Sequence, residues 1–338
     1  MKNIKSLAAL AIGFVAALIA ASAAGAADQP KLKLRLQTHL IPTQTARTLG
    51  MFAEQVTLAS KGSIEVTVFP VGAILPLKEV LDAVSKGTLD MAYYPEGFWF
   101  KQVPVSELGQ GVPYAFKNLD QAKTFMWKKG YEELLREAYA KQNVYVWGGE
   151  PFPVGLMTKK PIKTLADVKG VKLRATGMMA EFFGRLGAST SVIAAGELYT
   201  ALATGVVSGA HWGDAGPMYE MKFQEVLKNY MEPEPIQGGW NNFMINLDVW
   251  KKMTPEQRTA LDTAIRKSAE MGYQSSRNLT KQAIDDMGKK WQVQFNTLSN
   301  ADQKELEKLS AQLQDEIAKR DPLCAKAIAK LKETSAGK

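Results

Sequence analysis

The sequence predicts a mixed α/β fold in which two lobes are joined by a hinge. Polar and apolar residues alternate over 31–36, the period of a half-buried strand, and a helical pattern follows over about 43–60. A second strand pattern over 64–69 ends at Pro70. Strands that alternate with helices predict a mostly parallel sheet with helical crossovers. The chain has no repeats and no flexible linker, which is typical of lobes that the backbone crosses more than once.

The same patterns continue through the rest of the chain. We expect further strands at 89–94, 143–147, 154–158, 171–175, 190–193 and 242–247. We expect further helices at 78–85, 119–140, 165–169, 179–186, 196–204, 254–287 and 299–319. The glycines at 148–149 are expected to end a strand. Thr164 with Asp167, and Thr254 with Gln257, have the spacing of helix-capping pairs.

The first residues have the layout of a secretory signal peptide. A basic start at 1–5 is followed by an apolar run to Ala20 and by small residues at 24–26. The run is short and rich in alanine, which favours cleavage over the alternative of a membrane anchor. No later apolar run is long enough to span a bilayer. We therefore expect a signal peptide at 1–26 and a periplasmic location.

The composition argues against a nucleic-acid-binding protein and against a disulfide-stabilised one. The 338 residues are 46% hydrophobic and carry a net charge of +8, but the lysines are scattered among acidic residues. No basic stripe with interleaved aromatic residues is present. The positive charge is expected to favour capture of anions. Cys324 is the single cysteine, so no intramolecular disulfide can form, and we expect it to be a small buried residue.

Catalysis finds little support in the sequence. The chain has two histidines, His39 and His211, and no nucleophile elbow, dinucleotide fingerprint, phosphate-binding loop or zinc-protease motif. A histidine-assisted nucleophile would have to recruit one of these two residues through tertiary contact alone. We therefore predict that the protein is not an enzyme and assign it no cofactor and no metal site.

The residues that are most informative about function lie at 159–214. Residues 160–162 read KPI, residues 165–174 read LADVKGVKLR, and residues 195–210 read AGELYTALATGVVSGA. This ordered set resembles the extracytoplasmic solute-binding proteins (DctP type) of tripartite ATP-independent periplasmic (TRAP) transporters. The resemblance implies a two-lobed α/β periplasmic-binding-protein fold of type II-like form, with a ligand cleft, a hinge and long C-terminal helices that span the back.

The resemblance also implies a receptor function. Such a protein captures an organic acid between its lobes and delivers it to one small and one large membrane subunit for uptake driven by an ion gradient. Lobe I is expected to comprise 27–150 and about 239–278, and lobe II 151–238 and about 279–338. A module that presents solute to a sensor kinase or chemoreceptor is the alternative. A monomer is expected, and a dimer is left open.

The resemblance places the clamp for the ligand carboxylate at Arg174. A guanidinium can meet a carboxylate through two parallel hydrogen bonds, and Arg174 ends a strand where the chain must turn. Trp212 is a candidate pocket wall, with plain core packing as the alternative. His211 stands where relatives commonly carry glutamate, which argues against a metal ion bridging the ligand. Asp214 is a candidate for a ligand contact or for a helix cap.

The first lobe offers a second group of candidates. Tyr94 ends a predicted strand and Glu96 follows it, and Glu96 aligns loosely with an acidic residue that reaches the ligand in sialic-acid-binding members. Trp240 and Asn241 come directly before the strand at 242–247, and Asn242 is its first residue. Core packing is the alternative for the aromatic residues.

The ligand class is inferred from one difference between this chain and the family pattern and from the abundance of aromatic residues. Residues 154–156 read VGL where many relatives carry a second arginine, so a second ligand carboxylate would lack a partner. An aromatic or apolar monocarboxylate is therefore the first choice, and a keto or hydroxy acid or a C4-dicarboxylate stays open.

Overall fold

The computed structural model describes residues 31–337, so the predicted signal peptide at 1–26 lies outside the described residues. The strands are β1 (Leu32–Thr38), β2 (Ile64–Phe69), β3 (Met91–Pro95), β4 (Val144–Thr158), β5 (Lys172–Arg174), β6 (Ser189–Ser191), β7 (Gly209–Gly213), β8 (Asn229–Glu232), β9 (Ile236–Asn246) and β10 (Gln294–Thr297). The α-helices are α2 (Pro42–Ala59), α3 (Val80–Lys86), α4 (Leu119–Trp127), α5 (Tyr131–Ala140), α6 (Gly177–Arg185), α7 (Ala195–Thr204), α8 (Ala215–Glu220), α9 (Phe223–Val226), α10 (Leu247–Lys252), α11 (Pro255–Trp291), α12 (Asn300–Ala318) and α13 (Pro322–Ser335). The 3-10 helices are η1 (Leu77–Glu79), η2 (Glu96–Trp99), η3 (Pro104–Gln110) and η4 (Leu165–Val168). Within 31–337, no helix is both long enough and apolar enough to cross a membrane.

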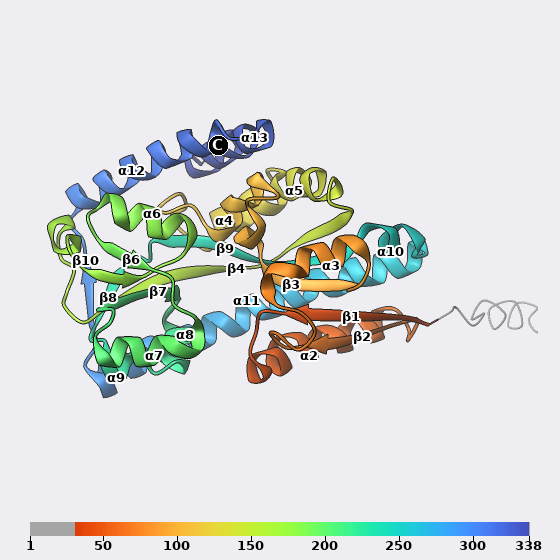
Figure 1. Cartoon of the computed structure of the whole chain (residues 1–338), viewed down its shortest axis with the longest axis horizontal. Coiled ribbons are helices and arrows are strands. Elements are labelled where there is room, and N and C mark those ends of the chain that lie inside the picture. The colour runs from red at the N-terminus through yellow and green to blue at the C-terminus, as the bar shows by residue number, and fades with distance from the viewer. Residues whose placement is uncertain (1–30, 338) are drawn as a thin grey trace, which may run out of the picture.

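The strands form one mixed sheet with the order β2-β1-β3-β9-β4-β7-β5-β6, to which β8 and β10 are attached beside β4. Pairing is parallel within each half, as between β1 and β3 or between β5 and β7. The expectation of a mostly parallel sheet is wrong at the centre, where β4 and β9 pair antiparallel with each other and with their outer neighbours. The reason is that β4 carries the chain from the first half to the second and β9 carries it back (Figure 1).

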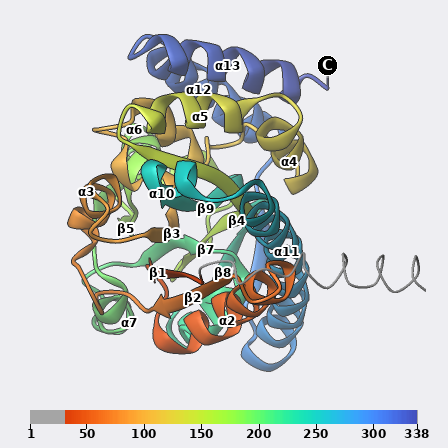
Figure 2. The same cartoon turned by 90° about the vertical axis from the view of Figure 1, so that its right-hand side faces the viewer.

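Helices cover both faces of this sheet. Figures 1 and 2 show α4, α5, α12 and α13 above the sheet and α2 below it, and α11 packs against α2, α8 and β4. Helix α11 is 37 residues long and runs along both halves of the molecule. It begins at the predicted cap, where Thr254 Oγ1 accepts from the Gln257 backbone N–H and the Gln257 side chain accepts from the Thr254 N–H. This capping box is confirmed, as is the one at Thr164 and Asp167.

Three clusters of buried apolar side chains hold the layers together. The largest joins the upper face of the sheet to α4, α5, α12 and α13, and the other two pack α2 and α7–α9 with α11 on the lower face. Full burial of one large apolar side chain contributes about 1.5–3 kcal/mol. Helix α13 packs on α4 and α5, whereas Arg185 of α6 pairs with Glu316 of α12. The C-terminal helices thus touch both halves, and the lobe limits stay a prediction.

Three elements differ from their predictions for local reasons. The helix expected at 119–140 is broken into α4 and α5 at Gly130, whose φ of +82° is left-handed. The glycines at 148–149 do not end a strand, because β4 passes through them with a register shift against β9. Helix α13 was not predicted, although Asp321 caps it by accepting from the Leu323 N–H at 2.7 Å. Cys324 lies in α13 and is buried, as expected.

Candidate functional site

Arg174 lies at the carboxyl end of β5, where the chain turns into α6. Its Nε donates to the Ile193 carbonyl at 3.3 Å and its Nη1 donates to the His211 carbonyl at 2.9 Å. The guanidinium carbon is 4.4 Å from the centre of the Trp212 ring, a cation–π contact. Burial lowers the pKa of Arg174 to about 10, so the group remains charged at neutral pH. Its Nη2 has no protein acceptor in the described part of the chain, which leaves this edge of the guanidinium for a ligand.

Strand β7 brings two further predicted residues beside Arg174. Because β5 and β7 pair in parallel, with Arg174 opposite Ala210, His211 and Trp212 follow directly along the neighbouring strand. Trp212 is half-buried, and its ring centroid is 6.4 Å from that of Phe223. His211 is 5% exposed, and burial next to Arg174 lowers its pKa to about 3. The imidazole is therefore neutral at neutral pH.

Asp214 caps α8 and ties it to α11. Its Oδ1 accepts from the Gly216 N–H at 3.2 Å, and its Oδ2 accepts from Thr280 Oγ1 at 2.5 Å. The helix-cap alternative is thus what the structure describes, and a ligand contact by Asp214 stays a prediction. Burial raises the pKa of this carboxyl from 3.8 to about 6.

The raised pKa of Asp214 predicts that this residue makes the fold less stable as pH rises. Below pH 3.8 the carboxyl is protonated in both states; between 3.8 and about 6 the unfolded chain loses the proton while the folded chain retains it. We expect the stability of Asp214→Asn, minus that of the wild type, to grow by roughly 3 kcal/mol across this window and then to level off. Urea unfolding at several pH values measures this difference. A pH-independent difference would contradict the prediction.

On the opposite side, Tyr94 and His39 lie at the carboxyl ends of β3 and β1. Tyr94 is fully buried, and its hydroxyl accepts from Gln37 Nε2 at 2.9 Å. The His39 ring lies 5.7 Å from the Tyr94 ring, and its Nδ1 donates to the Tyr93 carbonyl at 3.3 Å, which leaves Nε2 as an acceptor. Burial lowers the pKa of His39 to about 4. Sequence reasoning assigned His39 no binding role, although the residue follows the first predicted strand closely.

Glu96 is fully buried, and both of its oxygens have protein partners. Oε1 accepts from the Tyr131 hydroxyl at 2.8 Å and Oε2 accepts from Asn242 Nδ2 at 2.9 Å. Burial raises the pKa of Glu96 well above its ordinary value. Through these bonds the carboxyl group orients Asn242. They do not favour a direct contact between Glu96 and the ligand, and that contact stays a prediction. The Oδ1 of Asn242 has no partner among residues 31–337.

Asn241 belongs to a second buried polar group. Its Nδ2 donates to Glu150 Oε1 at 3.1 Å, and the same oxygen accepts from the Tyr93 hydroxyl. The Asn241 Oδ1 has no hydrogen-bond partner in the described structure. Sequence reasoning missed Glu150, because the preceding glycines at 148–149 were expected to end the strand that in fact positions it.

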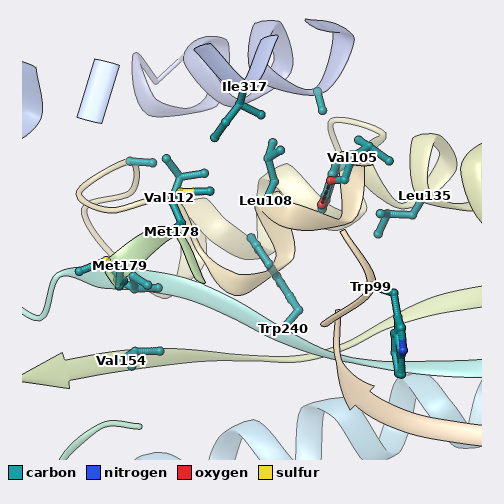
Figure 3. Packing of buried hydrophobic residues seen from close by; sticks show 14 of the residues in the cluster. Trp99, Val105, Leu108, Val112, Leu135, Val154, Met178, Met179, Trp240 and Ile317 are labelled. Atoms are coloured by element: carbon teal, nitrogen blue, oxygen red, sulfur yellow. Dashed lines mark hydrogen bonds between the residues drawn. The ribbon is translucent and has the colours of Figure 1, made fainter. Parts of the chain in front are cut away.

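Trp240 lies in the apolar core of the upper layer. It is fully buried, and its ring lies 6.2 Å from Phe116, 6.0 Å from Phe125 and 6.1 Å from Tyr131. Figure 3 shows the ring pointing from β9 toward Leu108. Of the two interpretations of Trp240, core packing is the one that this position favours, and a ligand contact stays untested.

The two halves touch at the segments that follow their strand ends. Arg47 of α2, which follows β1, places Nη1 at 2.5 Å from Glu220 Oε1 of α8, which follows β7. Gln110 of η3 packs so closely on Gly177 of α6 that a Cβ atom at Gly177 would lie 2.1 Å from Gln110 Oε1. A depression of about 470 Å³ lies between residues of both halves near Gly177. The segments that follow the strands of the two halves therefore meet along a seam.

Comparisons with known proteins agree with this geometry. A family model described as bacterial extracellular solute-binding protein, family 7 (DctP), matches residues 40–321. The monocarboxylate 2-oxoacid-binding periplasmic protein of Nostoc sp. is 27% identical over 237 residues, which are 66% of this chain and 63% of that protein. The C4-dicarboxylate-binding periplasmic protein DctP of Rhodobacter capsulatus is 24% identical over 332 residues, 96% of this chain and 97% of that protein.

A solved structure shares the fold over most of its length. The TRAP periplasmic solute-binding protein of Colwellia psychrerythraea, with bound calcium and pyruvate, superposes with a TM-score of 0.83 and 20% identity. The match covers 91% of this chain and 95% of that one. The two-lobed α/β solute-binding fold expected from the sequence is thereby confirmed.

Proposed function

The chain belongs to family 7 of the bacterial extracellular solute-binding proteins, and from this premise we propose that it is the periplasmic receptor of a TRAP transporter for a monocarboxylic acid. The observation that carries the proposal is the setting of Arg174. Two backbone carbonyls and the Trp212 ring hold its charged guanidinium, and one edge is left without a protein acceptor among the described residues. A fixed, partly desolvated arginine is suited to bind a carboxylate in two parallel hydrogen bonds.

A single ligand carboxylate fits the neighbourhood of Arg174 better than two. Val154 of β4 pairs with Gly213, the residue after Trp212, and its side chain is apolar and buried. A second carboxylate there would be desolvated without a cationic partner, which is costly. One relative is named for binding a monocarboxylate 2-oxoacid and another for a C4-dicarboxylate, and this local chemistry supports a monocarboxylate.

The receptor works in this proposal by closing around its ligand. Arg174 and Trp212 bind from one half, and Tyr94 and His39 complete the seam from the other. A ligand that touches both halves stabilises the closed form by its differential affinity for that form, and the membrane subunits recognise it.

A thermal-shift screen tests the proposal. The panel contains aromatic monocarboxylates, 2-oxo acids, C4-dicarboxylates and sugar acids, and a ligand at a hundred times its Kd stabilises the protein by about 2.7 kcal/mol. We expect shifts from monocarboxylates. Shifts from C4-dicarboxylates alone, or from no acid, would refute the proposal. Co-purification of the closed form with multi-span membrane subunits tests the partner.

The ion pair between Arg47 and Glu220 is expected to favour closure modestly. Both side chains are partly exposed, at 48% and 28%, so the pair contributes at most about 1 kcal/mol. Arg47→Gln should therefore raise the ligand Kd by up to about fivefold at low salt. Lys289→Gln, which breaks an exposed pair with Asp285 inside α11, should not change Kd. Calorimetry in low salt and in about 1 M salt, where the Debye length is about 3 Å, should show the difference vanish. Equal effects of the two variants would contradict a role in closure.

A further inference from the structure

His211 is a buried histidine whose ring lacks a partner. Its Nε2 has no hydrogen-bond partner among residues 31–337, although only 5% of the residue is exposed. One side of the ring faces Phe183, at 6.1 Å between ring centroids, which offers no hydrogen bond. Most buried polar atoms in proteins are satisfied, so an unsatisfied ring nitrogen next to a binding site requires an explanation.

The backbone of His211 already contacts Arg174. Its carbonyl accepts from Arg174 Nη1, the following residue Trp212 lies under the guanidinium, and β7 is held in place by pairing with Leu156 of β4. The charge of Arg174 is also close enough to lower the pKa of the imidazole. The His211 ring is thus within range of the Arg174 charge, and we expect a ligand carboxylate bound to Arg174 to approach the unpartnered ring.

The residues around Arg174 do not fit a hard metal cation. Calcium prefers six to eight oxygen ligands, several of them carboxylates. Here the nearby side chains are a guanidinium, which repels a cation, and a neutral imidazole. The Asp214 oxygens are taken by Gly216 and Thr280. In the part of the chain that the structure describes, no group of three or more His, Cys, Asp or Glu side chains could hold a metal. A calcium ion such as the one bound in the Colwellia protein therefore has no matching set of oxygen donors here.

We infer that His211 binds the ligand directly, so that Arg174 holds the carboxylate while the neutral imidazole hydrogen-bonds the oxygen on the adjacent carbon, and a 2-oxo or 2-hydroxy monocarboxylate is bound without a bridging metal ion. This inference rests on the proposed function and names its substrate class. A neutral imidazole has one donor and one acceptor nitrogen, so it can donate to an oxo oxygen or accept from a hydroxyl group. A carboxylate in its place would repel the same ligand oxygens unless a cation lay between them.

Isothermal titration of wild-type protein with 2-oxobutyrate, 2-hydroxybutyrate and butyrate tests this, because the three acids share the carboxylate and the carbon chain. We expect the oxygenated acids to bind at least about tenfold more tightly than butyrate, since a site built to hydrogen-bond a substrate group discriminates against ligands that lack it. Addition of EDTA should leave the three Kd values unchanged. Loss of binding in EDTA, or equal affinity for butyrate, would overturn the inference.

Variants of His211 separate ligand contact from structure. His211→Ala should lose at least about tenfold in affinity for 2-oxobutyrate and leave butyrate unchanged, whereas His211→Gln should recover part of the loss by donating through its amide. His211→Glu should bind 2-oxobutyrate only when calcium is added. An equal loss for both acids in His211→Ala would assign the residue a structural role and overturn the inference. If no monocarboxylate binds even the wild type, the proposed function fails as well.

Discussion

Arg174→Ala is expected to weaken binding of the organic acid by at least about 25-fold. Removing one member of a buried hydrogen-bonded charge pair costs about 2–5 kcal/mol, and each 1.4 kcal/mol corresponds to a tenfold change in Kd. In this protein the loss has two parts. The ligand carboxylate loses its cation, and the Ile193 and His211 carbonyls lose the donors that hold the seam in shape. Calorimetric titration with the acid that gives the largest thermal shift measures the change.

Arg174→Lys separates charge from geometry. Lysine keeps the positive charge, but its single ammonium group cannot donate to two carbonyls and to a carboxylate in one plane. We expect an affinity between those of the wild type and Arg174→Ala. Arg185→Ala is the matched control, because Arg185 lies one helix further along and pairs with Glu181 and Glu316 at the surface. An alanine variant at 174 that binds as tightly as the Arg185→Ala protein would remove Arg174 from the site.

The position of Arg174 could be predicted from the sequence, but its surroundings could not. The motif and the strand end both point to this residue. Its partners Ile193 and His211 are 19 and 37 residues away, and they approach it only because β5 lies between β6 and β7 in the sheet. Hydrogen bonds to backbone carbonyls leave no trace in side-chain composition, so a motif cannot reveal them.

For the aromatic and acidic residues at strand ends, the sequence did not distinguish a pocket residue from a core residue. Glu96 and Trp240 were predicted as candidates, like Tyr94, from their places at the ends of strands, yet their side chains are enclosed by Tyr131 and its neighbours in the upper core. The alternation of side chains along a strand does not separate these residues from Tyr94, because Tyr94 and Trp240 belong to the same buried cluster. Which residues of that face border the seam depends on which helices cover the sheet, and this is a property of the whole fold.

Helix α13 was missed although its start signal is in the sequence. Asp321 followed by Pro322 is a cap residue followed by proline at the first helical position, the arrangement that Thr254 and Pro255 have at the start of α11. The glycines at 148–149 led to the opposite error, because a strand end was predicted where β4 continues. Glycine occurs where two backbones approach closely as well as in turns.

That close approach makes Gly149→Ala the substitution with the largest expected cost to stability. A Cβ atom at Gly149 would lie 2.1 Å from the backbone oxygen of Asn241. A backbone carbonyl in the central pair of strands cannot rotate away as a side chain can, so β4 and β9 would have to separate. We expect a loss of about 3 kcal/mol in the free energy of unfolding, at the upper end for added atoms in a packed interior. Urea unfolding with an unchanged m-value measures it.

The matched control is Gly272→Ala, which adds the same methyl group on the other side of Glu150. There the new Cβ atom would lie 3.7 Å from the Glu150 side chain, an ordinary contact, within the middle of α11. Because alanine favours a helix over glycine by up to about 1 kcal/mol, this variant should be more stable than the wild type. The two variants thus differ in sign, and a Gly149→Ala protein that unfolds at the wild-type urea concentration would contradict the close approach. Since β4 and β9 carry the chain between the two halves, Gly149→Ala should also weaken ligand binding, whereas Gly272→Ala should not.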